Sequence, residues 1–220
     1  MYCFLDYRIS NEELNNLIKM QWYSLLAVKN YILLVVVIGF ITIFTQPTFI
    51  AFAGGMILMA VNYSVIAYED KSKMGYLIHS LPVGPKKYIL SKYIYGFISI
   101  VLVMIITLII FNIVNIFNIQ NLEGITLSTL LMSVLLIGVV INTVTVPVGI
   151  IVGFQKARFI ITILAIAPVC FSPTLVTLIS SININISEST LMILTLIAVA
   201  IFTVISYNIT SKLYCRRDVK

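Results

Sequence analysis

Residues 69–92, EDKSKMGYLIHSLPVGPKKYILSK, form the only long polar stretch in the middle of this chain. The stretch holds five lysines, two acidic residues and the only histidine of the protein. Apolar runs long enough to cross a bilayer flank it on both sides. We therefore expect residues 69–92 to connect two membrane spans on one side of the membrane.

The composition of the chain excludes an ordinary water-soluble domain. Of its 220 residues, 60% are hydrophobic and 10% are charged, whereas soluble domains carry about 25% charged residues. A chain this apolar cannot cover a surface that faces water, so lipid must be its solvent. The net charge of +6 comes from basic residues in short segments between apolar runs. This pattern indicates membrane topology and not nucleic-acid binding.

Six apolar runs predict an all-α membrane protein with six transmembrane helices. They cover approximately residues 30–46, 48–68, 93–119, 125–152, 159–182 and 190–207. The predicted organisation has three parts: an N-terminal cytoplasmic or interfacial segment (1–29), a transmembrane domain (30–209) and a basic tail (210–220).

The basic residues predict the orientation. All fourteen lie in the N-terminal segment, in 69–92, in 153–158 or in the C-terminal tail, and the other three connections carry none. Because positively charged loops stay in the cytoplasm, we expect both termini to be cytoplasmic in a multi-pass protein of a bacterial cell membrane.

The N-terminal segment predicts an amphipathic helix. Its apolar residues share one face at helical spacing, and Ser10 to Glu13 has the form of a capping box; these apolar residues are Leu14, Leu17, Ile18, Trp22 and Leu25. One interpretation is a helix in the membrane interface, with Trp22 and Tyr23 at headgroup level. The other is a soluble helix packed on a partner. Met1 and Met20 are both candidate start residues.

The interior of the predicted spans lacks ionisable residues. Ion-coupled carriers and pumps usually keep such a group near the middle of the membrane. No phosphate-binding loop motif is present, and the three cysteines and single histidine are too few and too dispersed for a zinc site. We expect no catalytic residues, no metal and no cofactor in this chain, so any energy for work must come from another chain.

Uncharged polar residues and a proline do occur within the spans. We interpret Asn62, Asn142, Thr143, Thr145 and Pro147 as hinge or path-lining residues. The alternative is that they hydrogen-bond between helices and kink them.

Within the polar stretch, apolar residues recur at the spacing of one helix face. The pattern predicts a short helix from Asp70 to Leu81, ended by Pro82, and a second helix that starts near Pro85 and continues into the third span. This unit is either a docking element for a soluble partner or an amphipathic loop lying on anionic lipid. The residues assigned to coupling are Glu69, Asp70, Met74, Leu77, Ile78, Leu81 and Pro82.

The sequence SLPVGPKKYILSKY, with Glu69-Asp70 upstream, resembles the loop after the second span of ABC-2 type transporter permeases. Those proteins commonly show an acidic start, a Leu-Pro-(Val/Ile) segment, basic residues and a Lys-Tyr entering the third span. The likeness extends to the amphipathic N-terminal helix and the six spans. Gly84-Pro85 departs from the Ser-Arg that is common there. The chain most resembles the permease subunits of the exporter of phenol-soluble modulins.

This resemblance implies a permease that dimerises with a second copy or a sister permease. It also implies two ABC ATPase subunits that bind ATP and magnesium at the cytoplasmic face. The expected function is outward transport of an amphipathic peptide or hydrophobic antimicrobial. The alternative is a non-transporting membrane scaffold, such as an assembly or immunity protein.

Overall fold

We analysed a computed structural model of the chain, which describes residues 11–45, 50–73, 84–116, 127–153, 156–157, 159–161, 163 and 188–215. The regular elements in these ranges are all helices, and none of the described residues belongs to a β-strand. The helices are α1 (Asn11–Ala27), α2 (Lys29–Thr45), α3 (Ile50–Lys71), α5 (Pro85–Ile116), α6 (Leu127–Val152) and α8 (Glu188–Cys215). The all-α prediction is confirmed for this part of the chain.

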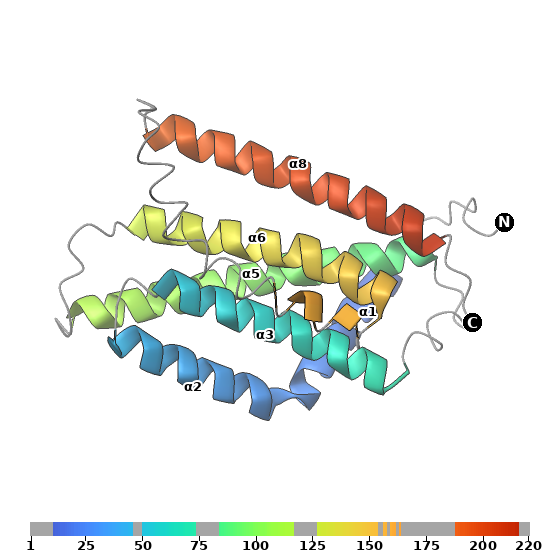
Figure 1. Cartoon of the computed structure of the whole chain (residues 1–220), viewed down its shortest axis with the longest axis horizontal. Helices are drawn as coiled ribbons and strands as arrows, with labels where there is room; N and C mark the ends of the chain where they lie inside the picture. The colour runs from blue at the N-terminus through green and yellow to red at the C-terminus, as the bar shows by residue number, and fades with distance from the viewer. Residues whose placement is uncertain are drawn as a thin grey trace.

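The long helices lie side by side in a bundle (Figure 1). α3 packs against α2, α5 and α6, and α6 also packs against α8. The central core is formed by buried aliphatic residues of α3, α5 and α6, such as Leu58, Val103 and Val134. Many residues on the outer faces are large, apolar and exposed, which fits a bundle that has lipid as its solvent.

Four described helices are long and apolar enough to cross a membrane: Phe52–Lys71, Lys86–Ile116, Leu130–Val152 and Leu196–Tyr214. α1 and α2 together make a fifth candidate, bent by 71° at their junction. The fifth predicted apolar run, 159–182, lies almost entirely outside the described residues. Six spans therefore remain a prediction, while the described residues form a bundle with four or five candidate spans.

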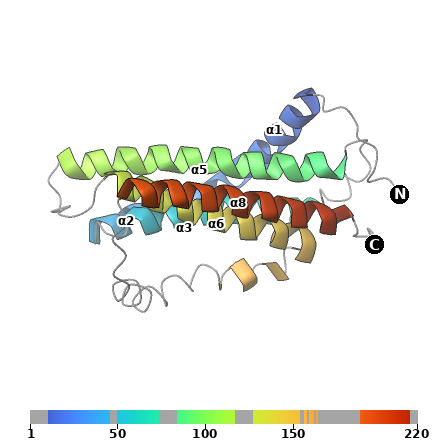
Figure 2. The same ribbon diagram turned by 90° about the horizontal axis from the view of Figure 1, so that it is seen from above.

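α1 crosses the bundle obliquely and does not run along it (Figure 2). It packs against α5 and α3. Its buried face is centred on Leu17, Gln21 and Ser24. The buried face is therefore rotated from the predicted apolar face. Trp22 lies at the edge of the buried face and packs edge-on against the Tyr95 ring of α5, with 5.6 Å between the ring centroids. A pattern of apolar residues alone does not include Gln21 and Ser24, because both side chains are polar although they are buried.

The predicted helix from Asp70 to Leu81 begins too early. Asp70 belongs to the last turn of α3, which ends at Lys71. The chain then turns through Ser72 and Lys73, and Lys73 adopts a left-handed φ of 53°, as residues after a helix C-terminus commonly do. A docking helix can start no earlier than residue 74, and residues 74–83 lie outside the described residues.

The prediction for the second half of this stretch is confirmed. α5 starts at Pro85 and runs without interruption to Ile116. Proline suits the first position of a helix because its missing N–H has no helical partner there and its φ is already helical. The backbone N–H of Lys87 donates to the Gly84 carbonyl at 3.0 Å, so the helical hydrogen bonding begins at the predicted turn.

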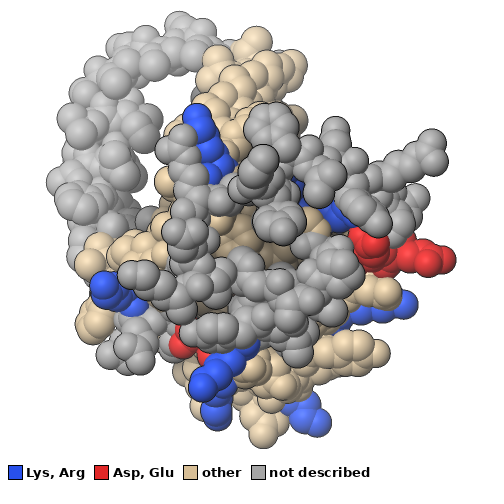
Figure 3. All heavy atoms as spheres, turned by 90° about the vertical axis from the view of Figure 1, so that its right-hand side faces the viewer, with Lys and Arg blue, Asp and Glu red and all other residues tan. Residues whose placement is uncertain are grey.

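Lysines collect at one end of the bundle, where α3 and α8 finish and α5 starts. We call this the basic end; its described lysines on these helices are Lys71, Lys73, Lys86, Lys87, Lys92 and Lys212. Figure 3 looks onto this end and shows lysine side chains at several places, with acidic side chains nearby. The clustering that the sequence predicted is thus present in three dimensions.

Candidate functional site

Polar side chains from α1, α3, α5 and α6 converge inside the bundle near its basic end. Of the predicted path-lining residues, Asn62 comes from α3, and Asn142, Thr143 and Thr145 come from α6; all four are buried. Glu69, which we had assigned to partner docking, is also buried. Glu69 is therefore part of the buried interior of the bundle and not of an exposed docking surface. The coupling residues Met74, Leu77, Ile78, Leu81 and Pro82 lie outside the described residues.

Glu69 forms an ion pair with Lys92 of α5. Their side chains are 10% and 6% exposed. The Tyr88 hydroxyl donates to the same carboxylate oxygen, Oε2, at 3.2 Å. The Lys92 ammonium also lies 5.2 Å from the centre of the Tyr88 ring. Removing two charges from water costs free energy. The attraction between the two charges and the contacts that Tyr88 makes with both offset this cost. The contact joins the end of α3 to the start of α5.

α1 is attached to the same part of α5 by two polar contacts. Lys87 donates to Glu13 Oε2 at 2.7 Å. About two turns further along α1, the Gln21 amide donates to Ser91 Oγ at 3.1 Å. Both Gln21 and Ser91 are fully buried. α1 is thus fixed to the first two turns of α5 by side chains that the apolar periodicity could not identify.

A small cavity lies among these groups, which we call the polar chamber. Its volume is about 20 Å³. The lining residues are Gln21, Asn62, Val65, Ile66, Lys92, Tyr95, Thr145 and Val146. They come from α1, α3, α5 and α6, so the chamber marks the point where these four helices meet.

Asn142 lies next to the chamber, against the glycine of α5 that follows Tyr95. A Cβ on Gly96 would overlap with the amide atoms of Asn142, far inside the distance of an ordinary van der Waals contact. Only a glycine permits this approach. The Asn142 side chain is therefore packed directly onto the α5 backbone, which places α5 and α6 in close contact.

α6 continues through Pro147 to Val152 and ends before Gly153, whose φ is +81°. Because proline has no backbone N–H, the carbonyl of Thr143 loses its partner within the helix. Ser206 of α8 supplies one: its hydroxyl donates to the Thr143 carbonyl at 2.8 Å. The Tyr93 hydroxyl lies 2.6 Å from Ser206 Oγ and 3.3 Å from Thr210 Oγ1. A proline in α6 is thus compensated by α8 and α5.

We expect Ser206→Ala to lower the free energy of unfolding by about 1 kcal/mol, since interhelical hydrogen bonds in membranes average about 0.6 kcal/mol and here a carbonyl is also left unpaired. In a Pro147→Ala background the loss should be smaller, because the backbone N–H that the alanine restores can donate to the Thr143 carbonyl. Thermal or denaturant unfolding in detergent measures both.

Thr203→Ala is the matched control for Ser206→Ala in both backgrounds. The Thr203 hydroxyl lies one turn earlier on α8 and donates to Ala200 of its own helix at 2.8 Å. Its removal should have the same small effect with or without Pro147. Equal losses for Ser206→Ala in both backgrounds would contradict the proposed compensation.

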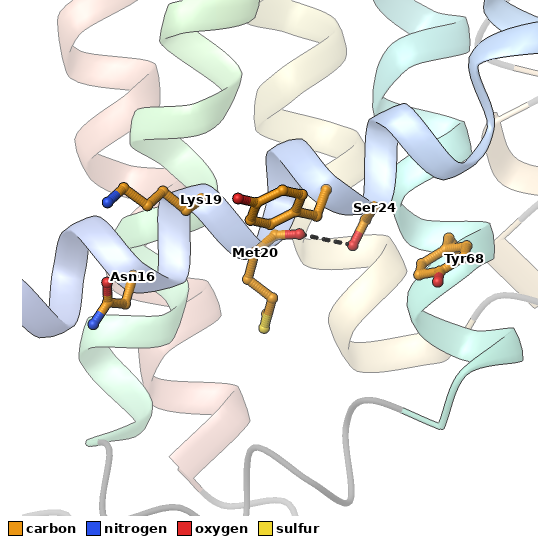
Figure 4. A pocket seen from close by; sticks show the side chains of 6 residues that line it. Asn16, Lys19, Met20, Ser24 and Tyr68 are labelled. Carbon is orange, nitrogen blue, oxygen red and sulfur yellow. Dashed lines mark hydrogen bonds between the residues drawn. The ribbon is translucent and has the colours of Figure 1, made fainter.

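Outside the bundle, a groove of about 330 Å³ runs between α1 and the end of α3. Figure 4 shows Asn16, Lys19, Met20 and Ser24 of α1 on one side and Tyr68 of α3 on the other. The Ser24 hydroxyl donates to the Met20 carbonyl at 3.0 Å. The lining residues include no histidine or carboxylate that could act as a base for the Ser24 hydroxyl.

Among the described residues, no group of three or more histidine, cysteine, aspartate or glutamate side chains could hold a metal ion. The organised features of the site are instead a buried ion pair, a polar chamber and a proline compensated from a neighbouring helix. Each of these features joins neighbouring helices.

The profile of the family described as ABC-2 family transporter protein matches residues 16–215. The chain belongs to the ABC-2 transporter family. The match includes all of α2, α3, α5, α6 and α8 and the part of α1 from Asn16 onward. Searches of the curated proteins and of the solved structures each returned no match.

Membership of the ABC-2 family makes the chain a multi-pass membrane subunit of an ABC transporter. ABC-2 permeases are not themselves the ATPase; they generally work with an ABC ATPase partner, often as dimers. The absence of a catalytic constellation from the sequence agrees with this division of labour. The resemblance to the family that we noted from residues 69–92 is thereby confirmed, whereas the narrower likeness to phenol-soluble modulin exporters stays a prediction.

Proposed function

We propose that this ABC-2 permease is the transmembrane subunit of an ATP-driven exporter, and that residues 74–82 receive the movement of the ATPase. The observation that carries the proposal is the position of this segment. It connects α3 to α5 at the basic end, and its two neighbouring helices are joined there by the Glu69–Lys92 ion pair. A force on residues 74–82 would act on both helices together.

The charge distribution supports a cytoplasmic location for this segment. The described lysines that flank it, Lys71, Lys73, Lys86 and Lys87, are all at the basic end. By the positive-inside rule this end faces the cytoplasm, where an ATPase can bind. In this scheme Met74, Leu77, Ile78 and Leu81 form the apolar docking face, and Glu69 positions it from within the bundle.

The proposed substrate is an amphipathic peptide or a hydrophobic antimicrobial, moved outward by a dimer of permeases. The predicted external connections are short, and the middle of the spans carries uncharged polar residues such as Asn142 and Thr145. Such an interior suits a substrate with both polar and apolar faces. A scaffold or immunity protein of this family would have no need of an apolar docking face.

The docking face can be tested by charge substitution. We expect Leu77→Asp or Ile78→Asp to reduce co-purification of the co-expressed ATPase about tenfold or more, since a buried carboxylate at an interface costs well above 1.4 kcal/mol. Membrane insertion of the permease should not change. The measurement is the ratio of ATPase to permease after affinity purification.

Tyr76→Asp is the control, because residue 76 lies off the predicted apolar face. Its ATPase recovery should stay near that of the wild type. Unchanged recovery with Leu77→Asp and Ile78→Asp would contradict the coupling assignment. The purified chain alone should hydrolyse no ATP, and measurable turnover would contradict the division of labour between permease and ATPase.

A further inference from the structure

The polar groups without a protein partner are concentrated at one place. Among the described residues, the buried side-chain oxygens and nitrogens that lack a hydrogen-bond partner belong to only five residues. These are Gln21, Asn62, Glu69, Tyr95 and Asn142. They come from α1, α3, α5 and α6, the same four helices that line the polar chamber. Since buried polar groups in proteins are nearly always paired, such a cluster requires an explanation.

Three of these residues line the chamber itself: Gln21, Asn62 and Tyr95. They are 0%, 6% and 3% exposed. The unpartnered atoms are the amide oxygen of Gln21, the amide nitrogen of Asn62 and the hydroxyl of Tyr95. Together they offer an acceptor, a donor and a group that can do either. Buried waters typically make about three hydrogen bonds of this mixed kind.

The size and charge of the chamber restrict its ligand. A volume of about 20 Å³ exceeds the roughly 10–15 Å³ that one water needs and leaves no room for a larger molecule. Lys92 lines the chamber, and its positive charge repels a metal cation. Gln21 also lines the chamber; its unpartnered amide oxygen repels an anion, as does the carboxylate of Glu69, the ion-pair partner of Lys92. A neutral ligand with both donors and acceptors satisfies all of these groups.

We propose that the polar chamber binds a resident water molecule, which hydrogen-bonds to Gln21, Asn62 and Tyr95. This water joins α1, α3 and α5 beside the Glu69–Lys92 ion pair, with Thr145 of α6 as the fourth wall. The inference concerns the folded chain and does not depend on the exporter function.

Two tyrosines of α5 provide an internal comparison for this proposal. Tyr93 and Tyr95 are two residues apart and are 4% and 3% exposed. The Tyr93 hydroxyl contacts Ser206 and Thr210, whereas Tyr95 lines the chamber and its hydroxyl has no hydrogen-bond partner in the protein. In radiolytic hydroxyl-radical labelling of the full chain in lipid nanodiscs, radicals form from bound water next to the residues it touches. We expect Tyr95 to be oxidised many times faster than Tyr93, as read by mass spectrometry.

A pair of variants links the labelling to the chamber. Val146 lines it, and Val144 lies two residues earlier on α6 and does not. Val146→Ile adds a methyl group to the chamber wall, so the oxidation rate of Tyr95 should fall to that of Tyr93. Val144→Ile adds the same group elsewhere and should leave the Tyr95 rate unchanged.

Equal oxidation of Tyr93 and Tyr95 in the wild type would overturn the proposal, because the chamber would then be dry. Fast Tyr95 oxidation that Val146→Ile leaves unchanged would also overturn it, since the radicals would come from water outside the chamber. The proposal is supported if the fast oxidation of Tyr95 is lost in Val146→Ile and kept in Val144→Ile. Both variants should be monodisperse, so that misfolding does not explain the difference.

Discussion

Glu69→Gln is expected to lower the free energy of unfolding by about 3–5 kcal/mol, the usual cost of breaking a buried ion pair by removing one partner. The substitution keeps the size of the side chain but leaves the Lys92 ammonium without its anion, at 6% exposure. It also weakens the hydrogen bond that the Tyr88 hydroxyl donates to Glu69. Steric-trapping or denaturant unfolding in detergent would measure the loss.

Lys92→Met should cost a similar amount, because it leaves the carboxylate unpaired in the same place. The double variant Glu69→Gln/Lys92→Met removes both charges and should recover most of the loss, since a buried pair replaced by neutral groups is often near neutral in stability. Lys86→Met, the same change at an exposed lysine of α5, should stay within about 0.5 kcal/mol of the wild type. Additive losses in the double variant would show that the ion pair is not a coupled unit.

Gly96→Ala is expected to destabilise the bundle by about 1–3 kcal/mol, the usual cost of overpacking. The new Cβ would overlap with the Asn142 amide, so Asn142 must move or α5 and α6 must separate. The higher helix propensity of alanine offsets only up to about 1 kcal/mol of this clash. The midpoint of thermal unfolding in detergent measures the net effect.

A second substitution should relieve that clash. Asn142→Ala removes the colliding amide, so Gly96→Ala/Asn142→Ala should be more stable than Gly96→Ala alone. Gly84→Ala is the control, because apart from its chain neighbours no atom of the described residues lies within 4 Å of the position of its Cβ. If Asn142→Ala fails to relieve the loss, the close contact between α5 and Asn142 is not its cause.

The sequence could predict features of this fold that follow from local chemistry. Pro85 after Gly84 predicted where α5 begins, because proline at a first helical position has a definite conformational preference. The lysine clustering predicted the basic end. Neither depends on which helices pack together, and so periodicity, charge and turn residues were sufficient.

Features that depend on packing could not be predicted in the same way. Glu69 and Lys92 looked like parts of an exposed polar loop, and only the arrangement of α3 and α5 shows that they neutralise each other. Gln21 and Ser24 are polar, and only the position of α1 across the bundle shows that they are buried. Pro147 did carry one usable signal: a proline within a span leaves the carbonyl four residues earlier unpaired, which called for a donor like that of Ser206.

The uninterrupted length of α5 has a mechanical consequence. At about 1.5 Å per residue, its attachment to α8 at Tyr93 lies about 12 Å from Pro85 and about 35 Å from Ile116. If α5 tilted as a rigid rod about this point, a shift of about 1 Å at the Pro85 end would become about 3 Å at the opposite end. Sub-ångström strain beside Gly84 would thus be enlarged into a movement of atomic size across the membrane.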